Sequence, residues 1–244
     1  TYIQFYKALR EQTGFTRVYI VAEDVLWARQ LAGVLQKYLA KTGWEVVGVT
    51  FYPLGTKDFS AELTKIRESR AQVIATVIAS PDSIPFIKQY HDFKIPALVA
   101  GVDVLAQNTE FWNQTDGKCI YEVFMTTMVR APITEKTIPW YDKYRSKYGK
   151  APMYIAAGAY DALYLLKEAA EKAGTLELDA LIKALEEIDY TGVIGRVKFT
   201  SYHDVVWGPG YVMPIMAQWQ GYDLQVAIWP PSAKTGELKL PPWM

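Results

Sequence analysis

Polar and acidic side chains follow several apolar segments of this 244-residue chain, at the points where those segments end. The residues concerned are Glu23, Asp24 and Trp27; Ser80, Pro81, Asp82 and Ser83; Gly101 and Asp103; and Thr126 and Thr127. Carboxylates, hydroxyls and a large aromatic ring hold small molecules by charge, hydrogen bonds and ring contact. These residue types therefore predict binding chemistry.

Patterns that support catalysis or a cofactor are missing from the sequence. The two histidines, His91 and His203, lie at metal-ligand spacing neither from each other nor from the single cysteine, Cys119. No phosphate-binding glycine loop, dinucleotide fingerprint or Gly-x-Ser-x-Gly elbow occurs. We expect no cofactor, no metal and no enzymatic activity. Cys119 is expected to be an inert core residue on a strand.

The composition narrows the class of protein further. Hydrophobic residues make up 50% of the chain and charged residues 21%, which is typical of a globular protein with one large domain or two small ones. The 26 basic and 26 acidic side chains give a net charge of zero, and no Lys/Arg cluster forms a basic surface for nucleic acid. Apolar runs such as 73–79 are much shorter than the ~20 residues that cross a bilayer.

The first half of the chain alternates between strand and helix patterns. The predicted strands are 17–24, 45–50, 73–79, 97–100 and 119–123, with helices at about 31–39, 59–66, 83–92 and near Phe111. Strands separated by helices imply a parallel sheet covered on both faces, a doubly wound α/β lobe. In such sheets ligands bind in the crevice at the carboxyl ends of the strands, where the polar residues would gather.

The same polar residues also have purely structural explanations, which stay open at this point. Ser80 or Ser83 can cap the helix that follows. Trp27 can be buried against the sheet, and Asp103 can cap a turn.

The second half of the chain follows a different pattern. Three helices are predicted at about 136–148, 153–173 and 177–187, with Gly149 and Gly174 as stops, but only one short strand, 196–200, accompanies them. A sheet for these helices to cover is missing, so we expect roughly 100 residues or more to precede Thr1 in the parent protein. Segments 211–219 and 224–229 predict a hairpin, and Pro214 indicates that its first strand lies at a sheet edge.

Several runs resemble one known family, the type I periplasmic binding proteins of ABC transporters, in their branched-chain-amino-acid-binding branch. The similar runs are Val18–Asp24, Trp27–Ala32, Pro53–Ser60, Lys147–Pro152, Ala159–Leu163 and Gly192–Phe199, so the resemblance extends over nearly the whole chain. It implies a fold of two doubly wound parallel-sheet lobes joined by a hinge. On this resemblance, residues 1–124 and 202–244 build lobe 2, and residues 125–201 are the returning part of an incomplete lobe 1.

The resemblance also implies a function. A periplasmic or extracellular receptor, with or without a lipid anchor, would close around a small solute and deliver it to the membrane permease of an ABC transporter. The implied solute is an amino acid or related carboxylate, with aromatic acids left open. A ligand-sensing domain of a cytosolic regulator with the same fold stays open as an alternative, as does an enzyme of flavodoxin-like architecture.

Site residues are carried over from the family position by position. Trp27 stands where the family places an aromatic ring over the ligand, and Asp103 matches the acidic residue that accepts the ligand's ammonium group. Ser80 stands near a second aromatic position, at which this sequence has small residues instead, and Asp82 follows it in the same polar turn.

The family's lobe 1 supplies further contacts. Tyr154 or Tyr160 approximates a lobe 1 tyrosine near the cleft. The groups that hold the ligand's carboxylate in this family lie chiefly in the part of lobe 1 that would precede Thr1.

Overall fold

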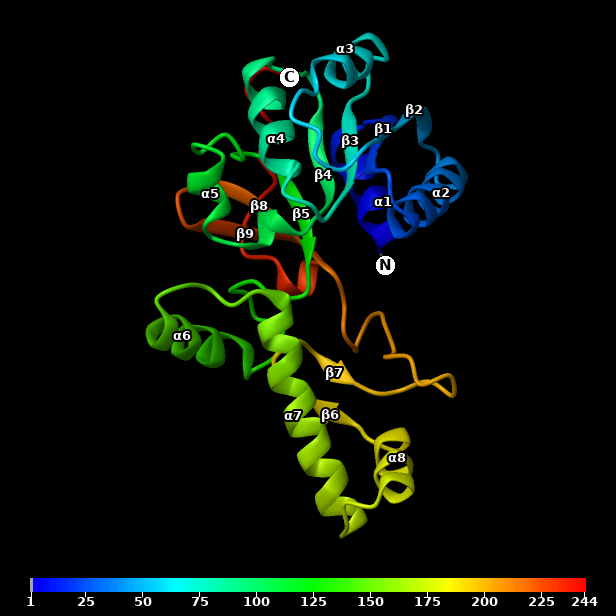
Figure 1. Cartoon of the computed structure of the whole chain (residues 1–244), viewed down its shortest axis with the longest axis vertical. Coiled ribbons are helices and arrows are strands. Elements are labelled where there is room, and N and C mark those ends of the chain that lie inside the picture. The colour runs from blue at the N-terminus through cyan, green and yellow to red at the C-terminus, as the bar shows by residue number, and fades with distance from the viewer. Residues whose placement is uncertain (1) are drawn as a thin grey trace.

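The computed structural model describes residues 2–244, which form two parts (Figure 1). The sheet part comprises α1 (Tyr2–Thr13), β1 (Arg17–Glu23), α2 (Leu26–Lys41), β2 (Glu45–Tyr52), α3 (Ser60–Glu68), β3 (Val73–Ile78), α4 (Ser83–Asp92), β4 (Leu98–Asp103), α5 (Phe111–Gln114), β5 (Val123–Thr126), β8 (Ile215–Gly221) and β9 (Leu224–Trp229). The helical part comprises α6 (Thr137–Tyr148), α7 (Tyr154–Ala173), α8 (Leu178–Glu186), β6 (Tyr190–Thr191) and β7 (Arg196–Val197). Short 3-10 turns lie at Leu105–Gln107 and Pro231–Ala233.

Seven strands form the large sheet in the order β2-β1-β3-β4-β5-β8-β9. Strands β1 to β5 run parallel, whereas β8 pairs antiparallel with β5, and β9 antiparallel with β8. Helices α1 and α2 cover one face of the sheet, and α3, α4 and α5 cover the other. Every residue of β3 and β4 is therefore buried. The predicted α/β class with a doubly wound, largely parallel sheet is confirmed.

The helical part is built around α7. This helix buries one stripe, Ala157, Asp161, Leu165 and Ala169, against α8 and the short antiparallel pair β6-β7. Gly149 and Gly174 end α6 and α7 in the left-handed conformation, at φ 72° and 65°, as the sequence predicts. Within residues 2–244, the strands of this part have only two residues each, so its helices cover no large sheet.

The fifth strand begins later than the sequence predicts. Residues 119–123 were expected to form it, but β5 starts at Val123, and Cys119 lies in the preceding turns, fully buried. Gly117 and Tyr121 there take positive φ values of 74°, which let the backbone turn repeatedly and not extend. The position predicted for Cys119 on a strand is wrong. Burial raises the pKa of its thiol, as expected for a core cysteine.

The structure corrects the expectation for Pro214 and adds a helix that was not predicted. Pro214 does not mark an edge strand, because β8 begins after it at Ile215 and lies between β5 and β9. Its missing N–H thus falls outside the paired residues of the ladder. The helix that was not predicted is α1, which buries Phe5, Tyr6 and Leu9 against the sheet.

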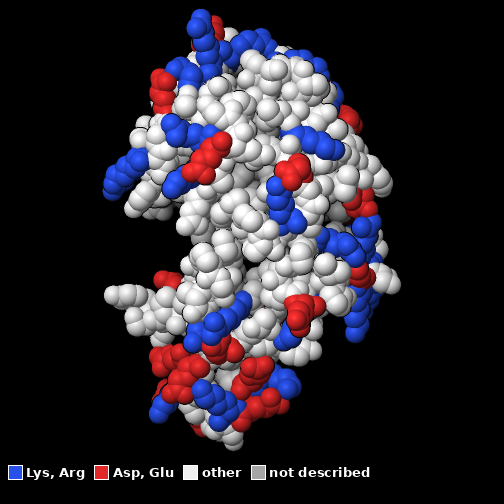
Figure 2. Space-filling model, turned by 180° about the vertical axis from the view of Figure 1, so that it is seen from behind, with Lys and Arg blue, Asp and Glu red and all other residues white. Residues whose placement is uncertain are grey.

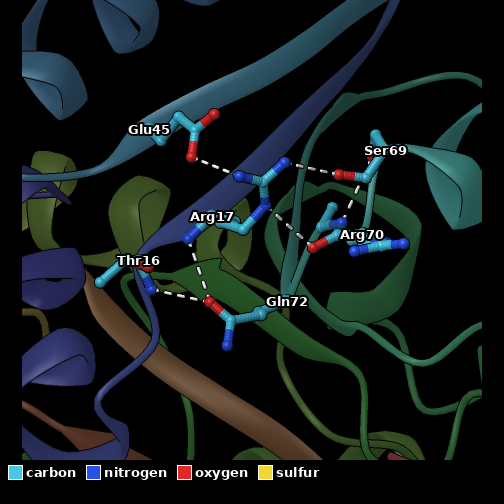
Figure 3. Close-up of polar contacts among 7 residues, drawn as sticks. Thr16, Arg17, Glu45, Ser69, Arg70 and Gln72 are labelled. Carbon is cyan, nitrogen blue, oxygen red and sulfur yellow. Dashed lines mark hydrogen bonds and ion pairs between the residues drawn. The ribbon is translucent and has the colours of Figure 1, made fainter.

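The amino ends of the first strands are joined by one charged side chain (Figure 3). The Arg17 guanidinium contacts the Glu45 carboxylate and donates hydrogen bonds to the carbonyls of Ser69 and Arg70, at 2.9 and 3.3 Å. The Gln72 side-chain oxygen accepts the backbone N–H of Arg17 at 3.1 Å. These bonds therefore hold together the amino ends of β1, β2 and β3.

Candidate functional site

The carboxyl edge of the sheet faces the helical part. Strand β5 runs parallel to β4, and its chain continues from Thr126 into the helical part, so the carboxyl ends of the parallel strands point the same way (Figure 1). Seen from behind, the surface is hollowed between the two parts, and few charged side chains line the hollow (Figure 2). The predicted polar residues thus lie at an edge that borders a recess.

Glu23 joins two of the strand ends at this edge. Its Oε1 accepts a hydrogen bond from the indole N–H of Trp27 at 3.1 Å. Its Oε2 accepts the backbone N–H groups of Ala79 and Ser80 at 3.1 and 3.0 Å. Glu23 is 3% exposed, whereas Trp27 at the start of α2 is 39% exposed. The alternative that Trp27 is a core residue is therefore wrong, because a buried carboxylate holds its ring at the surface.

Asp82 fixes the neighbouring loop. Its Oδ2 accepts the backbone N–H of Gly55 at 2.7 Å, and its Oδ1 lies 4.0 Å from the ammonium of Lys57. The Tyr52 hydroxyl lies beside Ser80 in the same buried region. Burial raises the pKa of Tyr52, and the nearby carboxylates of Glu23, Asp82 and Asp103 add to the increase.

The expected capping of α4 by serine is wrong. Asp82 occupies the cap position without a side-chain cap bond, and the Oγ atoms of Ser80 and Ser83 are buried without a hydrogen-bond partner. The backbone of Ser80 bonds instead to Glu23, a residue on another strand. The hydrogen bonds between Glu23 and the polar turn after β3 therefore connect the ends of β1 and β3, and no side-chain bond of the turn caps α4.

Asp103 is enclosed at the end of β4. It is 1% exposed, and its Oδ1 accepts the backbone N–H groups of Leu105 and Ala106 at 3.0 and 3.3 Å. The expectation that this residue can cap a turn is confirmed. Its Oδ2 is buried without a hydrogen-bond partner and faces Ser83 and Glu122.

Glu122, just before β5, forms a buried acid pair with Asp103. Neither of its carboxyl oxygens has a hydrogen-bond partner among the described residues, and the side chain is 1% exposed. Burial raises the pKa of Asp103 to about 6 and raises that of Glu122 well above its usual range, with the Asp103 carboxyl adding to the latter. The two carboxyls therefore retain a proton between them near neutral pH.

The two tyrosines predicted from lobe 1 lie on α7 and have different surroundings. Tyr154 begins α7 and is 36% exposed, at the end of the helix that faces the sheet part (Figure 1). Tyr160 packs its ring against Trp140 of α6 and Tyr164, with centroid distances of 5.3 and 4.8 Å. A hydrogen bond with Tyr164 raises the pKa of Tyr160 to about 12. Tyr160 thus belongs to an aromatic cluster between α6 and α7.

The structure brings four of the predicted residues to one edge and leaves two on the other part. Trp27, Ser80, Asp82 and Asp103 surround the Glu23 carboxylate and the Tyr52 hydroxyl. Glu23 was predicted to lie at this edge but was given no role of its own, and Tyr52 and Glu122 were not among the predicted residues. Glu122 had a visible signal in the sequence, since an acid inside an apolar run is costly to bury and suggests a role.

Residues 2–244 were also searched for metal-binding groups and for helices that could cross a membrane. No three side chains among their His, Cys, Asp and Glu residues are grouped so that they could hold a metal ion. Over the same span, no helix combines the length and hydropathy needed to cross a membrane.

Comparisons with known proteins agree with this architecture. Residues 4–218 match the family of periplasmic binding proteins. The chain belongs to this family. This periplasmic binding protein is 29% identical over 195 residues to the Leu/Ile/Val-binding protein BraC3 of Rhizobium johnstonii, a match that covers 78% of this chain and 51% of that one. The resemblance noted in the sequence is therefore confirmed.

Solved structures show the same fold for this periplasmic binding protein. A protein from Silicibacter pomeroyi, described as a branched-chain amino acid ABC transporter, superposes with a TM-score of 0.88 at 19% identity over 100% of this chain and 66% of the other. A solute binding protein from R. palustris, in complex with benzoate, gives a TM-score of 0.78 at 14% identity over 97% and 65%. The chain spans about half the length of the curated relatives it matches.

Proposed function

We propose that this chain is the larger part of an extracytoplasmic receptor that captures a small molecule between two lobes and delivers it to the permease of an ABC transporter. The observation that carries the proposal is the carboxyl edge of β1, β3 and β4, which borders the recess between the parts and holds Trp27 exposed beside buried polar groups. Ligand binding at this edge is general for open parallel sheets. The relatives are solute-binding proteins, and we propose no enzymatic activity.

Within this function, we propose roles for the predicted residues. Trp27 contacts the solute with its exposed ring, and Tyr154 faces it from the helical part. Ser80 and Asp82 shape the wall, because their bonds to Glu23 and Gly55 fix the strand ends.

The proposal includes a division into lobes. Residues 1–124 and 202–244 are one lobe, and residues 125–201 belong to a second lobe whose sheet is supplied by other residues of the parent protein. The exposed apolar face of α7 supports this division, since helices of an α/β lobe normally cover a sheet.

The solute class proposed from the relatives is an amino acid or a related carboxylate. Leu, Ile and Val are named for BraC3, and benzoate for the R. palustris protein, so both aliphatic and aromatic bodies occur among the similar proteins. All of these ligands carry a carboxylate.

A thermal-shift screen of the full-length protein with amino acids and organic acids tests the function. A solute that binds only the folded state raises the melting temperature in proportion to the logarithm of its concentration. Isothermal titration then gives the affinity, and stimulation of the transporter's ATPase in proteoliposomes tests delivery. No shift with any compound of the library would refute the proposed function.

A further inference from the structure

We propose that the solute of this receptor carries a carboxylate and an apolar body but no ammonium group, because the carboxyl edge of the sheet, as far as residues 2–244 form it, offers no accessible, unpaired carboxylate to an ammonium. This inference rests on the proposed function, that a solute is held at the carboxyl edge. It departs from the ammonium contact that the resemblance implies for Asp103.

Three of the four acids at this edge are already occupied. Glu23 accepts three hydrogen bonds through its two oxygens and is 3% exposed. Asp24 is at the surface and is paired with the Arg29 guanidinium in the first turns of α2. Asp82 is 3% exposed and bonded to the Gly55 N–H, with Lys57 beside its second oxygen. None of them is an unpaired anion facing the recess.

The fourth acid, Asp103, is withdrawn from the recess. A contact between a solute and the sheet part requires surface that is accessible before the second lobe closes. Asp103 is 1% exposed, and its Oδ2 is wholly buried. The side chains next to this carboxyl group, Ser83 and Glu122, are themselves buried.

The Asp103–Glu122 pair also lacks the charge that an ammonium would need. Two adjacent carboxylates cannot both ionise without a nearby cation, and the side chains that lie near this pair, Ser83, Tyr52, Tyr90 and Cys119, carry no positive charge. A shared proton supplies the donor that the buried oxygens lack in the protein. Asp103 is thus an internal acid and not a counter-ion.

The groups that are accessible at the edge favour an acid with an apolar body. Lys57 is highly exposed and adds positive charge beside Asp82, and Trp27 presents a large flat ring. A cation and an aromatic surface attract a carboxylate and an apolar body, respectively. Lys57 and Trp27 therefore favour the same kind of solute as the acids at this edge do, an apolar carboxylate without an ammonium group.

Matched solute pairs that differ only in the ammonium group test the inference. Isothermal titration of the full-length receptor would compare phenylalanine with phenylpropanoate and leucine with isocaproate. We expect the acid without the ammonium to bind at least tenfold more tightly in one pair. Trp27→Ala should weaken that acid at least tenfold, whereas Trp207→Ala, a change at an exposed tryptophan of the 200–210 loop, should leave its affinity within twofold.

The outcomes separate this inference from the proposed function. Equal or tighter binding of the amino acid in both pairs overturns the inference. If neither pair binds but another compound of the library stabilises the protein, the solute class is wrong and the receptor function stands. Infrared spectra add a test that needs no solute: a protonated carboxylic acid band at neutral pH should disappear in Glu122→Gln, and its absence from the unmodified protein would contradict the shared proton.

Discussion

The two parts of the molecule use their helices in different ways. In the sheet part, α1 and α2 lie on one face of seven strands and α3 to α5 on the other, and each face has a continuous apolar core. In the helical part, α7 has a buried stripe against α8 and the β6-β7 pair, but Ile155, Leu163 and Leu166 on its other side are 58%, 70% and 47% exposed. Each helix of the sheet part covers the large sheet with an apolar face, although α2 also exposes Val34 and Tyr38, whereas α7 has no large sheet within residues 2–244 to cover.

We propose from this difference that the helical part packs against a surface other than residues 2–244. Scattered apolar residues are normal at a protein surface, but a run of them along one helix is an interaction face. Leu178 on α8 adds to it at 69% exposure. We propose that the face covers the missing sheet of the second lobe.

The largest expected effect is in the complete core of the sheet part. Trp219 is fully buried, donates its indole N–H to the Ala106 carbonyl at 2.9 Å, and packs on Phe124. Trp219→Ala should lower the free energy of unfolding by about 4 kcal/mol through the cavity it leaves. Urea unfolding measures this, with Trp207→Ala, an exposed site, as the matched control at under about 0.5 kcal/mol. An equal effect of the two substitutions would contradict the difference in burial.

A smaller effect is expected at the one buried acid of the helical part. Asp161 of α7 accepts the backbone N–H groups of Val193 and Ile194 at 2.9 and 3.0 Å. Asp161→Ala leaves these donors without partners and should cost about 2 kcal/mol. Hydrogen exchange should show the loss of protection in 190–197 and not in β1 to β4. Glu168→Ala, an exposed position on the same helix, is the control. Loss of protection throughout the sheet part would mean that the two parts unfold as one unit.

The acid pair predicts how the stability of the sheet part depends on pH. Because the folded-state pKa values of Asp103, about 6, and of Glu122 are raised, the folded protein holds protons that the unfolded chain releases above about pH 4. The free energy of unfolding should therefore fall as the pH rises from about 4 through 6, by up to ~1.4 kcal/mol per pH unit for each retained proton. Melting curves between these pH values measure this slope.

Glu122→Gln removes one of the two titrating groups with little change in shape. The fall in stability with rising pH should be shallower in this variant than in the unmodified protein, and Glu168→Gln, at an exposed site of α7, should leave the slope unchanged. A steeper slope in Glu122→Gln would show that the pair does not retain a proton.

The smallest expected effect tests the open face of α7. Leu163 is 70% exposed, so Leu163→Gln should change the unfolding free energy of this chain by less than about 0.5 kcal/mol. In a parent protein that supplies the second sheet, the same change should cost about 1.5 kcal/mol or more, because the leucine would then be buried. Parallel denaturation of the two lengths measures the difference. Equal small effects in both would refute the proposed cover of this face.

Much of the sheet part could be predicted from the sequence because its strands are apolar runs between helices with a clear period. The same logic failed at 119–123, where an apolar run encodes buried turns, since a pattern of burial does not distinguish a strand from a packed turn. The prediction of an edge strand from Pro214 was wrong because a proline excludes a central strand only when it lies within the paired residues, and here the ladder begins after it. Helix α1 was not predicted, although Phe5, Tyr6 and Leu9 recur at helical spacing.

The sequence predicted where the candidate site lies in the fold, but it did not predict which side chains contact one another there. The positions of Trp27, Ser80, Asp82 and Asp103 at the carboxyl edge follow from strand order. Which of them is exposed does not, because the outward position of Trp27 depends on a side-chain bond to Glu23, four residues earlier, and Asp103 is buried beside Glu122 from another strand end. The spacing of apolar residues does not report side-chain contacts of this kind.

The bond between Glu23 and Trp27 has a consequence for the affinity of the receptor. A free indole on a helix would lose rotational freedom when a solute binds, at a cost of about 0.5–1.5 kcal/mol for the side chain. Here the indole N–H is already bonded to a carboxylate that also fixes the end of β3 through two backbone N–H groups. The ring is therefore ordered in the folded protein, so at the solute contact that we propose for Trp27 the entropy of ordering this side chain would already have been lost on folding and would not weaken binding.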